Sequence, residues 1–189
     1  MVFVGANDGM LHAFDAQVNG ASTGGQELFA LVPNAVFRGP DDLPAESGLK
    51  ALTDNAYQHR YYVNATPMVR DVDFARAGVT PSASATPDWR TLLVTGLGKG
   101  GRSYVAIDVT DPASWTSETA VAGKVLWEFT HEDMGFSFGR PLIAKTAKWG
   151  WVVILAGGYN NNLGSDTSKK GKGVVFIVDP RNGSLLQTV

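Results

Sequence analysis

A glycine-rich segment is the first candidate for chemistry in this chain. Residues 96–101 read G-x-G-x-x-G, a spacing that binds phosphate groups, and Arg102 stands where a related phosphate-loop pattern requires lysine. Both patterns hold phosphate with the backbone amides at the start of a helix. The residues that follow, 103–109, have the pattern of a strand instead. We therefore expect a flexible hairpin at these glycines and no nucleotide site.

A second motif, residues 135–139, reads G-x-S-x-G and would make Ser137 the nucleophile of a serine hydrolase. That nucleophile belongs on a turn between a buried strand and a helix. Here Pro141 follows and opens another apparent strand. No catalytic partner can be assigned among the three histidines, His12, His59 and His131. We interpret the motif as a glycine-flanked crossing between two sheets, in which Phe136 and Phe138 pack.

Three short segments carry atoms that a metal ion could use. Asp71 and Asp73 have the alternating carboxylates that open a calcium loop, but the later positions of such a loop are missing. A surface strand end is the favoured reading, and a half calcium site is the alternative. Residues 160–162 are asparagines that offer oxygen ligands, although the lysines at 169 and 170 argue against a tight cation site. Residues 131–133, His-Glu-Asp, are adjacent and cannot converge on one metal, so we expect a solvated loop there.

The composition excludes several classes of function. The chain of 189 residues has no cysteine, which removes disulfides, thiolate zinc sites and cysteine nucleophiles. A charged share of 18% and a net charge of −2 give no electrostatic reason to expect nucleic acid as a partner. No apolar run is long enough for a transmembrane helix. With no catalytic set to assemble, the chain is expected not to be an enzyme.

The elements that must position these motifs follow one layout, which occurs three times. Each copy has an apolar strand, a glycine-rich turn and a second apolar strand that ends in aspartate, at Asp15, Asp108 and Asp179. We expect each of these side chains to accept amide hydrogens from the turn that follows. Radially repeated four-stranded units build a β-propeller, whose function lies in its loops. The predicted fold is all-β, a partial β-propeller with quinoprotein-like four-stranded blades and long inter-strand loop insertions.

The strand pattern predicts two full blades and most of a third. The expected strands cover residues 2–5, 10–14 and 26–32, then 66–72, 90–95, 102–109 and 124–129, and finally 140–145, 151–156, 173–178 and 184–189. Residues 1–189 then form a single incomplete propeller domain, with blade pieces at about 1–37, 64–130 and 138–189 and an insertion at 33–63 that holds a short helix around 47–57. Blade packing is expected of Trp127, Trp149 and Trp151. A start and an end within strands indicate a piece of a longer protein.

The order of these segments resembles the C-terminal β-propeller of PilC/PilY-type type IV pilus biogenesis proteins. The matching segments are residues 2–15, 27–37, 59–63, 96–102, 106–112 and 136–141, and the likeness covers essentially the whole chain, insertions as well as strands. Residues 2–15 and 123–129 also resemble the general quinoprotein-type repeat. One departure is Asn64-Ala65, where such proteins often have Asp-Gly.

The resemblance implies a large bacterial protein that is exported and displayed at the cell surface or pilus tip, in the outer membrane or periplasm. Such proteins support pilus extension against retraction, and many act in adhesion. The implied partners are pilus subunits or a host or abiotic surface, contacted through the long loops. The candidate contact residues are Tyr57, His59, Tyr61, Tyr62, Asn160, Asn161 and Asn162. In that family a calcium loop usually lies in the next blade, so no cofactor is expected here and calcium is possible only elsewhere in the parent protein.

Two other functions share parts of the pattern. A dehydrogenase with a quinone cofactor needs a polar pocket floored by tryptophan on the propeller axis, usually with metal ligands, and no such set can be assembled from these residues. A scaffold for outer-membrane protein assembly would have shorter and more regular loops, without the insertion at 33–63. The favoured function is therefore a non-enzymatic propeller that supports pilus assembly and surface attachment through its loops.

Overall fold

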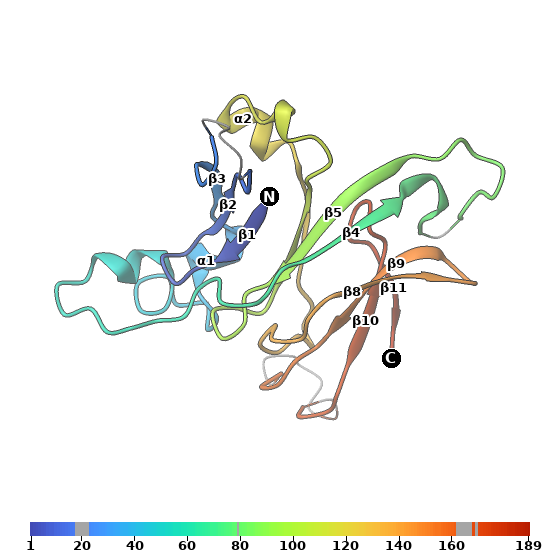
Figure 1. The fold of residues 1–189 in the computed structure, drawn as a ribbon. Helices are drawn as coiled ribbons and strands as arrows, with labels where there is room; N and C mark the ends of the chain where they lie inside the picture. Colours follow the sequence, from blue (N-terminus) through green and yellow to red (C-terminus); the bar gives the residue numbers. More distant parts are fainter. Residues whose placement is uncertain (18–22, 79, 162–167, 169) are drawn as a thin grey trace.

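The structure is a computed structural model that describes residues 1–17, 23–78, 80–161, 168 and 170–189. Three antiparallel sheets follow one another along the chain (Figure 1). The first contains β1 (Val2–Gly5), β2 (Leu11–Phe14) and β3 (Glu27–Leu31). The second contains β4 (Met68–Asp73), β5 (Trp89–Gly96), β6 (Tyr104–Asp108) and β7 (Val125–Phe129). The third contains β8 (Leu142–Thr146), β9 (Gly150–Ala156), β10 (Val175–Val178) and β11 (Leu185–Thr188).

The predicted strands are all present, and their observed ends differ from the predicted ends by at most two residues. In each sheet neighbouring strands are also neighbours in sequence, the up-and-down order of a propeller blade. The repeated aspartates stand at the ends of β2, β6 and β10, because Asp108 is the last residue of β6 and Asp15 and Asp179 directly follow β2 and β10. These three strands are therefore equivalent. The first sheet therefore has equivalents of the last three strands of a blade, as the sequence predicted.

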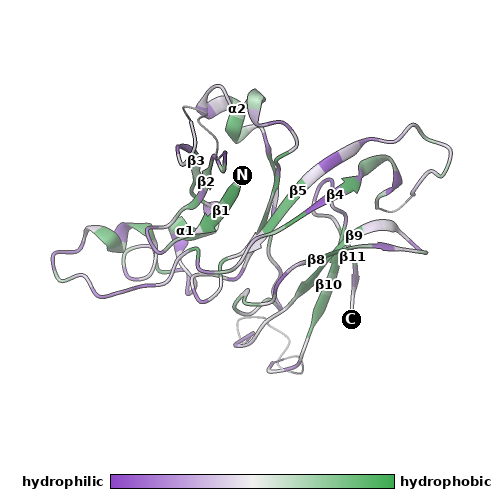
Figure 2. Ribbon diagram, in the orientation of Figure 1, coloured by the Kyte–Doolittle hydropathy of each residue, from purple (hydrophilic) through white to green (hydrophobic). Residues whose placement is uncertain are grey.

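Apolar side chains fill the two spaces between successive sheets, and strands such as β1, β8 and β10 are largely hydrophobic (Figure 2). Tyr104, Phe129 and Phe176 belong to the cluster between the second and third sheets. Trp127 joins the same two sheets, because its indole nitrogen donates to the carbonyl of Pro180 at 2.9 Å. Trp127 and Trp151 are both buried, which confirms the packing role predicted for them. The same prediction is wrong for Trp149, which lies half-buried in the β8–β9 turn, outside the core.

Short helices lie only in the connections of the described part. They are α1 (Asn34–Arg38), η1 (Leu49–Thr53), η2 (Phe74–Arg76), η3 (Pro112–Ser114) and α2 (Glu118–Ala122). The helix expected around 47–57 is the 3₁₀ helix η1. The sequence did not predict α1, whose first amides, of Asn34 and Ala35, donate to the carboxylate of Glu128 at 2.6 and 3.3 Å. That cap comes from a distant strand, so no local capping signal precedes the helix. Within the described residues no helix has the length and apolarity to cross a membrane.

The connections alternate between two ends of the sheets. One end, which we call the crossing face, carries the crossings between sheets (residues 32–67 and 130–141) and the hairpins β1–β2, β5–β6 and β9–β10. Backbone bonds join these loops, since the amide of Val63 donates to Ala6 and that of Phe136 donates to Tyr159. The opposite face carries the connections β4–β5, β6–β7, β8–β9 and β10–β11. The crossing face lies toward the lower left in Figure 1.

Candidate functional site

The two glycine motifs bind each other at the crossing face. Residues 97–103 connect β5 to β6 as a hairpin, which confirms that no helix follows these glycines. Ser137 is fully buried, and its hydroxyl accepts from the amide of Leu97 at 2.8 Å and donates to the carbonyl of Gly101 at 3.2 Å. The amide of Gly98 donates back to the carbonyl of Ser137 at 3.3 Å. Ser137 thus clamps the crossing to the hairpin, as expected of a structural residue.

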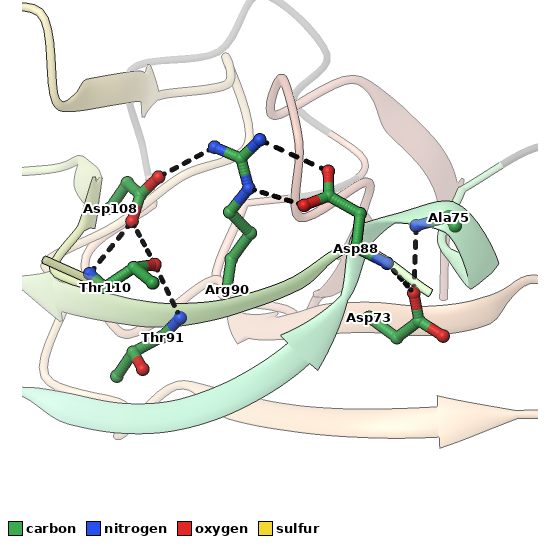
Figure 3. A network of polar contacts seen from close by, with 7 residues as sticks. All are labelled: Asp73, Ala75, Asp88, Arg90, Thr91, Asp108 and Thr110. Atoms are coloured by element: carbon green, nitrogen blue, oxygen red, sulfur yellow. Dashed lines mark hydrogen bonds and ion pairs between the residues drawn. The ribbon is translucent and has the colours of Figure 1, made fainter. Parts of the chain in front are cut away.

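The repeated aspartates make the predicted turns on the opposite face. The Oδ1 atoms of Asp15 and Asp108 each accept at 3.0 Å from the amide two residues further on. Asp179 does the same at 2.9 Å. Arg90 then links Asp108 at 3.0 Å to Asp88 at 2.9 Å, in the network drawn in Figure 3. Burial acts to raise the pKa of Asp108, but its bonds to Thr110 and Arg90 outweigh burial and hold that pKa below its usual value.

The two carboxylates considered for calcium also lie within this region. Asp73 is buried, accepts from the amides of Ala75 and Asp88 at 3.2 and 2.9 Å, and pairs with Arg76 (Figure 3 shows the two amides). Asp71 accepts from the hydroxyl of Thr91 at 2.7 Å. A calcium ion on Asp73 would have to displace Arg76. Within the described ranges, no group of three or more histidine and acidic residues is placed to hold a metal ion.

The segment 131–133 differs from the predicted solvated loop. Asp133 is 2% exposed, and its carboxylate lies 3.6 Å from Nδ1 of His131. The ring of His131 in turn lies 4.9 Å from that of Phe176. The sequence shows three polar residues in a row, and only the packing of the crossing against the third sheet removes Asp133 from solvent.

Three of the candidate contact residues lie exposed on the crossing face. Tyr57 and Tyr61 are 44% and 38% exposed, and His59 is exposed as well. The rings of His59 and Tyr61 meet edge to face at 4.9 Å. The ammonium group of Lys99, from the β5–β6 hairpin, lies 4.8 Å from the centre of the Tyr61 ring. The insertion and the hairpin therefore present one mixed aromatic and cationic surface.

Two other candidates are corrected by the structure. Tyr62 is fully buried, and its hydroxyl donates to the carbonyl of Gly48 at 3.1 Å. Asn161 is 3% exposed, and its side-chain amide bonds the backbone of Gly171 and Lys172 at 3.0 Å each. Both side chains stabilise loops and are not available for contact. Asn160 is exposed, at a positive φ of 61°, and Asn162 lies outside the described residues.

An aromatic pair on the crossing face was missed by sequence reasoning. Phe138 and Tyr159 are 47% and 56% exposed, and their rings stack at 5.4 Å with an angle of 22°. Phe136 lies beside them, 9% exposed, with the guanidinium of Arg102 4.5 Å from its ring centre. Phe136 packs as predicted, whereas Phe138 does not. The sequence signal that could have indicated this pair is an aromatic residue next to a glycine in a crossing or hairpin, because side chains in such loops lie at the surface.

A pocket of about 240 Å³ lies between the insertion, Lys99 of the β5–β6 hairpin and Phe136 of the second crossing. It is lined by Pro40, Asp41, Ser47, His59, Arg60, Tyr61, Lys99 and Phe136. The Nε atom of Arg60 is buried and has no hydrogen-bond partner in the described part of the chain. A larger cleft of about 380 Å³ lies on the other side of Pro40, but its charged groups are satisfied, since Glu128 caps α1 and Arg38 pairs with Asp42 at 2.5 Å.

Comparison with known proteins gives one consistent family. A family model described as the PilY1 beta-propeller domain matches residues 1–189. A type IV pilus biogenesis factor PilY1 homolog of Xylella fastidiosa is 37% identical over 100% of this chain and 10% of that protein. The type IV pilus biogenesis factor PilY1 of Pseudomonas aeruginosa (strain UCBPP-PA14) is 35% identical over 98% of this chain and 13% of that protein. The crystal structure of the Pseudomonas aeruginosa PilY1 C-terminal domain aligns with a TM-score of 0.61 and 31% identity, over 100% of this chain and 29% of that one.

Proposed function

The chain belongs to the PilY1 β-propeller domain family, and from that premise we propose that it serves type IV pilus biogenesis as a non-enzymatic docking platform. Its crossing face would contact pilus subunits or an attachment surface. Support comes from the relatives, which are named as pilus biogenesis factors and not as enzymes. Because the chain spans 10% and 13% of two of these relatives, the activity of the whole protein is part of the proposal.

The observation that carries the proposal is the convergence of exposed aromatic side chains from three separate loops. Tyr61 comes from the insertion, Phe138 from the second crossing and Tyr159 from the β9–β10 hairpin. Arg102, in the β5–β6 hairpin, contacts all three loops. Its guanidinium donates to the carbonyls of Pro40, at 2.9 Å, and Asn160, and lies 4.5 Å from the ring centre of Phe136. A surface that is ordered before binding loses less entropy when a partner docks. Exposed aromatic clusters of this kind are typical of protein contact sites.

The proposal places the protein outside the cytoplasm, exported to the cell envelope and displayed at the cell surface or pilus tip. It assigns no cofactor to this chain, and any calcium of the parent protein would bind elsewhere. The alternatives, a quinone-dependent dehydrogenase and an outer-membrane assembly scaffold, lack support from the names of the relatives.

The test changes the aromatic surface in the intact gene. Tyr61→Ala, Phe138→Ala and Tyr159→Ala are combined, and surface pili are counted with the retraction motor present and absent. We expect loss of pili that returns when retraction is removed. Trp89→Ala is the matched control, because Trp89 is 57% exposed but starts β5 at the opposite face. The surface level of each variant confirms that it is exported.

Unchanged piliation in both backgrounds would overturn the assembly role. Normal pili combined with reduced attachment to a surface would overturn assembly and support the attachment role. A defect of equal size in the Trp89→Ala control would show that the effect does not belong to the crossing face.

A further inference from the structure

The pocket of about 240 Å³ on the crossing face is lined by hydrogen-bond donors that lack an acceptor within the described residues. Arg60, Lys99 and His59 line it, and within the described residues neither Arg60 nor Lys99 forms an ion pair. The buried Nε–H of Arg60 has no acceptor in the part of the chain that the structure describes. That atom is closed to solvent, but no other hydrogen bond or ion pair engages the Arg60 guanidinium within the described residues, so its outer nitrogens are available to a ligand in the pocket.

We propose that this pocket binds a side-chain carboxylate of an acidic protein segment. A carboxylate accepts hydrogen bonds without donating any, and guanidinium groups bind it with two parallel bonds. Arg60 would supply that contact, and Lys99, an exposed lysine in the β5–β6 hairpin, would add a second charge to the lining of the pocket. The one carboxylate in the lining, Asp41, lies 4.0 Å from Arg102, which compensates part of its charge.

The surroundings favour an acidic peptide over an acidic sugar. Sugar hydroxyls need acceptors as well as donors, and the charged groups of this pocket are mainly donors. Tyr61 and Phe136 form apolar walls, and the stacked pair of Phe138 and Tyr159 continues the aromatic surface beyond Phe136. Apolar side chains next to the acidic residue would pack on these rings. The expected segment is therefore extended, with acidic and apolar residues side by side.

This inference rests on the proposed function only for the source of the segment, which would be a pilus assembly partner. The binding itself is measured on the purified intact gene product, with fluorescein-labelled peptides in which glutamate alternates with leucine, valine or phenylalanine. Fluorescence anisotropy is recorded at low and at high salt. We expect binding that weakens with salt, and that weakens about tenfold with Lys99→Gln and with Arg60→Gln.

Lys148→Gln is the matched control. Lys148 is also an exposed lysine over an aromatic ring, 4.1 Å from the centre of Trp149, but it lies in the β8–β9 turn at the opposite face. Its loss removes the same charge and the same type of contact, so unchanged peptide binding is expected. Lys99 is exposed, which keeps the test valid if Arg60→Gln perturbs the loop.

Several results would overturn the inference. These are equal binding by peptides with glutamine in place of glutamate, equal binding by Lys99→Gln and the parent protein, and no binding by any acidic peptide. Binding of oligogalacturonate in place of the peptides would assign the pocket to an acidic glycan. Peptide binding could depend on Lys99 while the Lys99→Gln strain has normal pili in both motor backgrounds. That result would support the binding site but contradict its role in pilus assembly.

Discussion

At the scale of single residues, one amino-acid type has different roles set by its surroundings. Asp15 is half-buried and accepts from the amide of its own turn, whereas Asp108 is buried and also pairs with Arg90. Asp73 accepts two amides and pairs with Arg76. A buried carboxylate needs such partners, because its desolvation disfavours the charged form. Asp73, one of the two carboxylates considered for calcium, therefore has the same kind of structural contacts as the repeated aspartates.

Asp108→Asn tests this network. The asparagine keeps an oxygen for the amide of Thr110 but loses the ion pair with Arg90, so we expect a loss of about 1–3 kcal/mol in unfolding free energy. The value should lie near the lower end, because Arg90 is 40% exposed. Urea unfolding of the intact gene product measures it, with Asp71→Asn at an exposed position as the control. Equal midpoints for the two variants would contradict the role of the pair.

The contacts of His12 in the first sheet lead us to predict that the stability of the fold depends on pH. Its ring nitrogens bond Glu27 at 2.5 Å and Asp8 at 2.9 Å, and these bonds, that to Glu27 foremost, raise the pKa of His12 above its usual value. The charged imidazolium is therefore favoured in the folded state. Its contribution is fully present below about pH 6.5, the unfolded value, and is lost as the pH rises through the folded pKa.

The measurement is the melting temperature of the intact product against pH, for the parent protein and for His12→Gln. We expect the difference between the two to shrink as the pH rises. A difference that stays constant from acid to alkaline pH would contradict the assignment, because a neutral ring would then make the same contribution.

At the scale of elements, the β5–β6 hairpin is shaped to receive the insertion. The backbone amide of Asn64 donates to the carbonyl of Leu97. The side-chain oxygen of Asn64 accepts from the backbone amide of Lys99 at 3.0 Å. A Cβ atom on Gly100 would lie 1.8 Å from the carbonyl oxygen of Tyr62. Gly100, which is not one of the motif glycines, is thus required by the close approach of two backbones. Gly96, the first motif glycine, is placed in the same way, because a Cβ atom there would lie 2.3 Å from the carbonyl oxygen of Ser137, so packing accounts for it as well.

Gly100→Ala should therefore loosen the crossing face. The added methyl group cannot fit without moving the backbone of residue 62, and we expect a cost of about 1–3 kcal/mol. Gly173→Ala is the control, because its Cβ would meet nothing within 4 Å. Limited proteolysis of the insertion, together with thermal melting, would show the effect. Equal cleavage rates in both variants would contradict the packing of the insertion against the β5–β6 hairpin at Gly100.

At the scale of the whole molecule, the third sheet has one face on the core and one that other parts of the described chain leave partly open. Leu142, Ile154 and Ile177 pair across β8, β9 and β10, so they form one row on that open face. Leu142 is 50% exposed, and Val175 beside the row is 37% exposed. A contiguous apolar sheet face of this kind drives association.

Residues 1–189 expressed alone are therefore expected to associate. Sedimentation velocity would show species larger than the monomer, and Leu142→Ser combined with Val175→Thr should shift the distribution toward the monomer, because both changes reduce the apolar area. A monodisperse monomer with a cooperative melt would contradict the prediction.

The sequence by itself determined the strands, their order, the turns after Asp15, Asp108 and Asp179, and the strand that follows the glycines at 96–101. These features depend on neighbours in the chain, since alternation and turn chemistry are local. The membership of Trp127 and Trp151 in the core follows from the same strand pattern.

Only the tertiary structure decided the candidate site. The sequence could not separate exposed Tyr61 from buried Tyr62, or Asn160 from Asn161, because an irregular segment has no period that assigns a face. Phe138 and Tyr159 meet only after the second crossing and the β9–β10 hairpin pack together. The orphaned Arg60 is likewise visible only once the insertion folds over the β5–β6 hairpin. Local patterns specify elements, whereas a surface built from several loops depends on contacts between residues far apart in the chain.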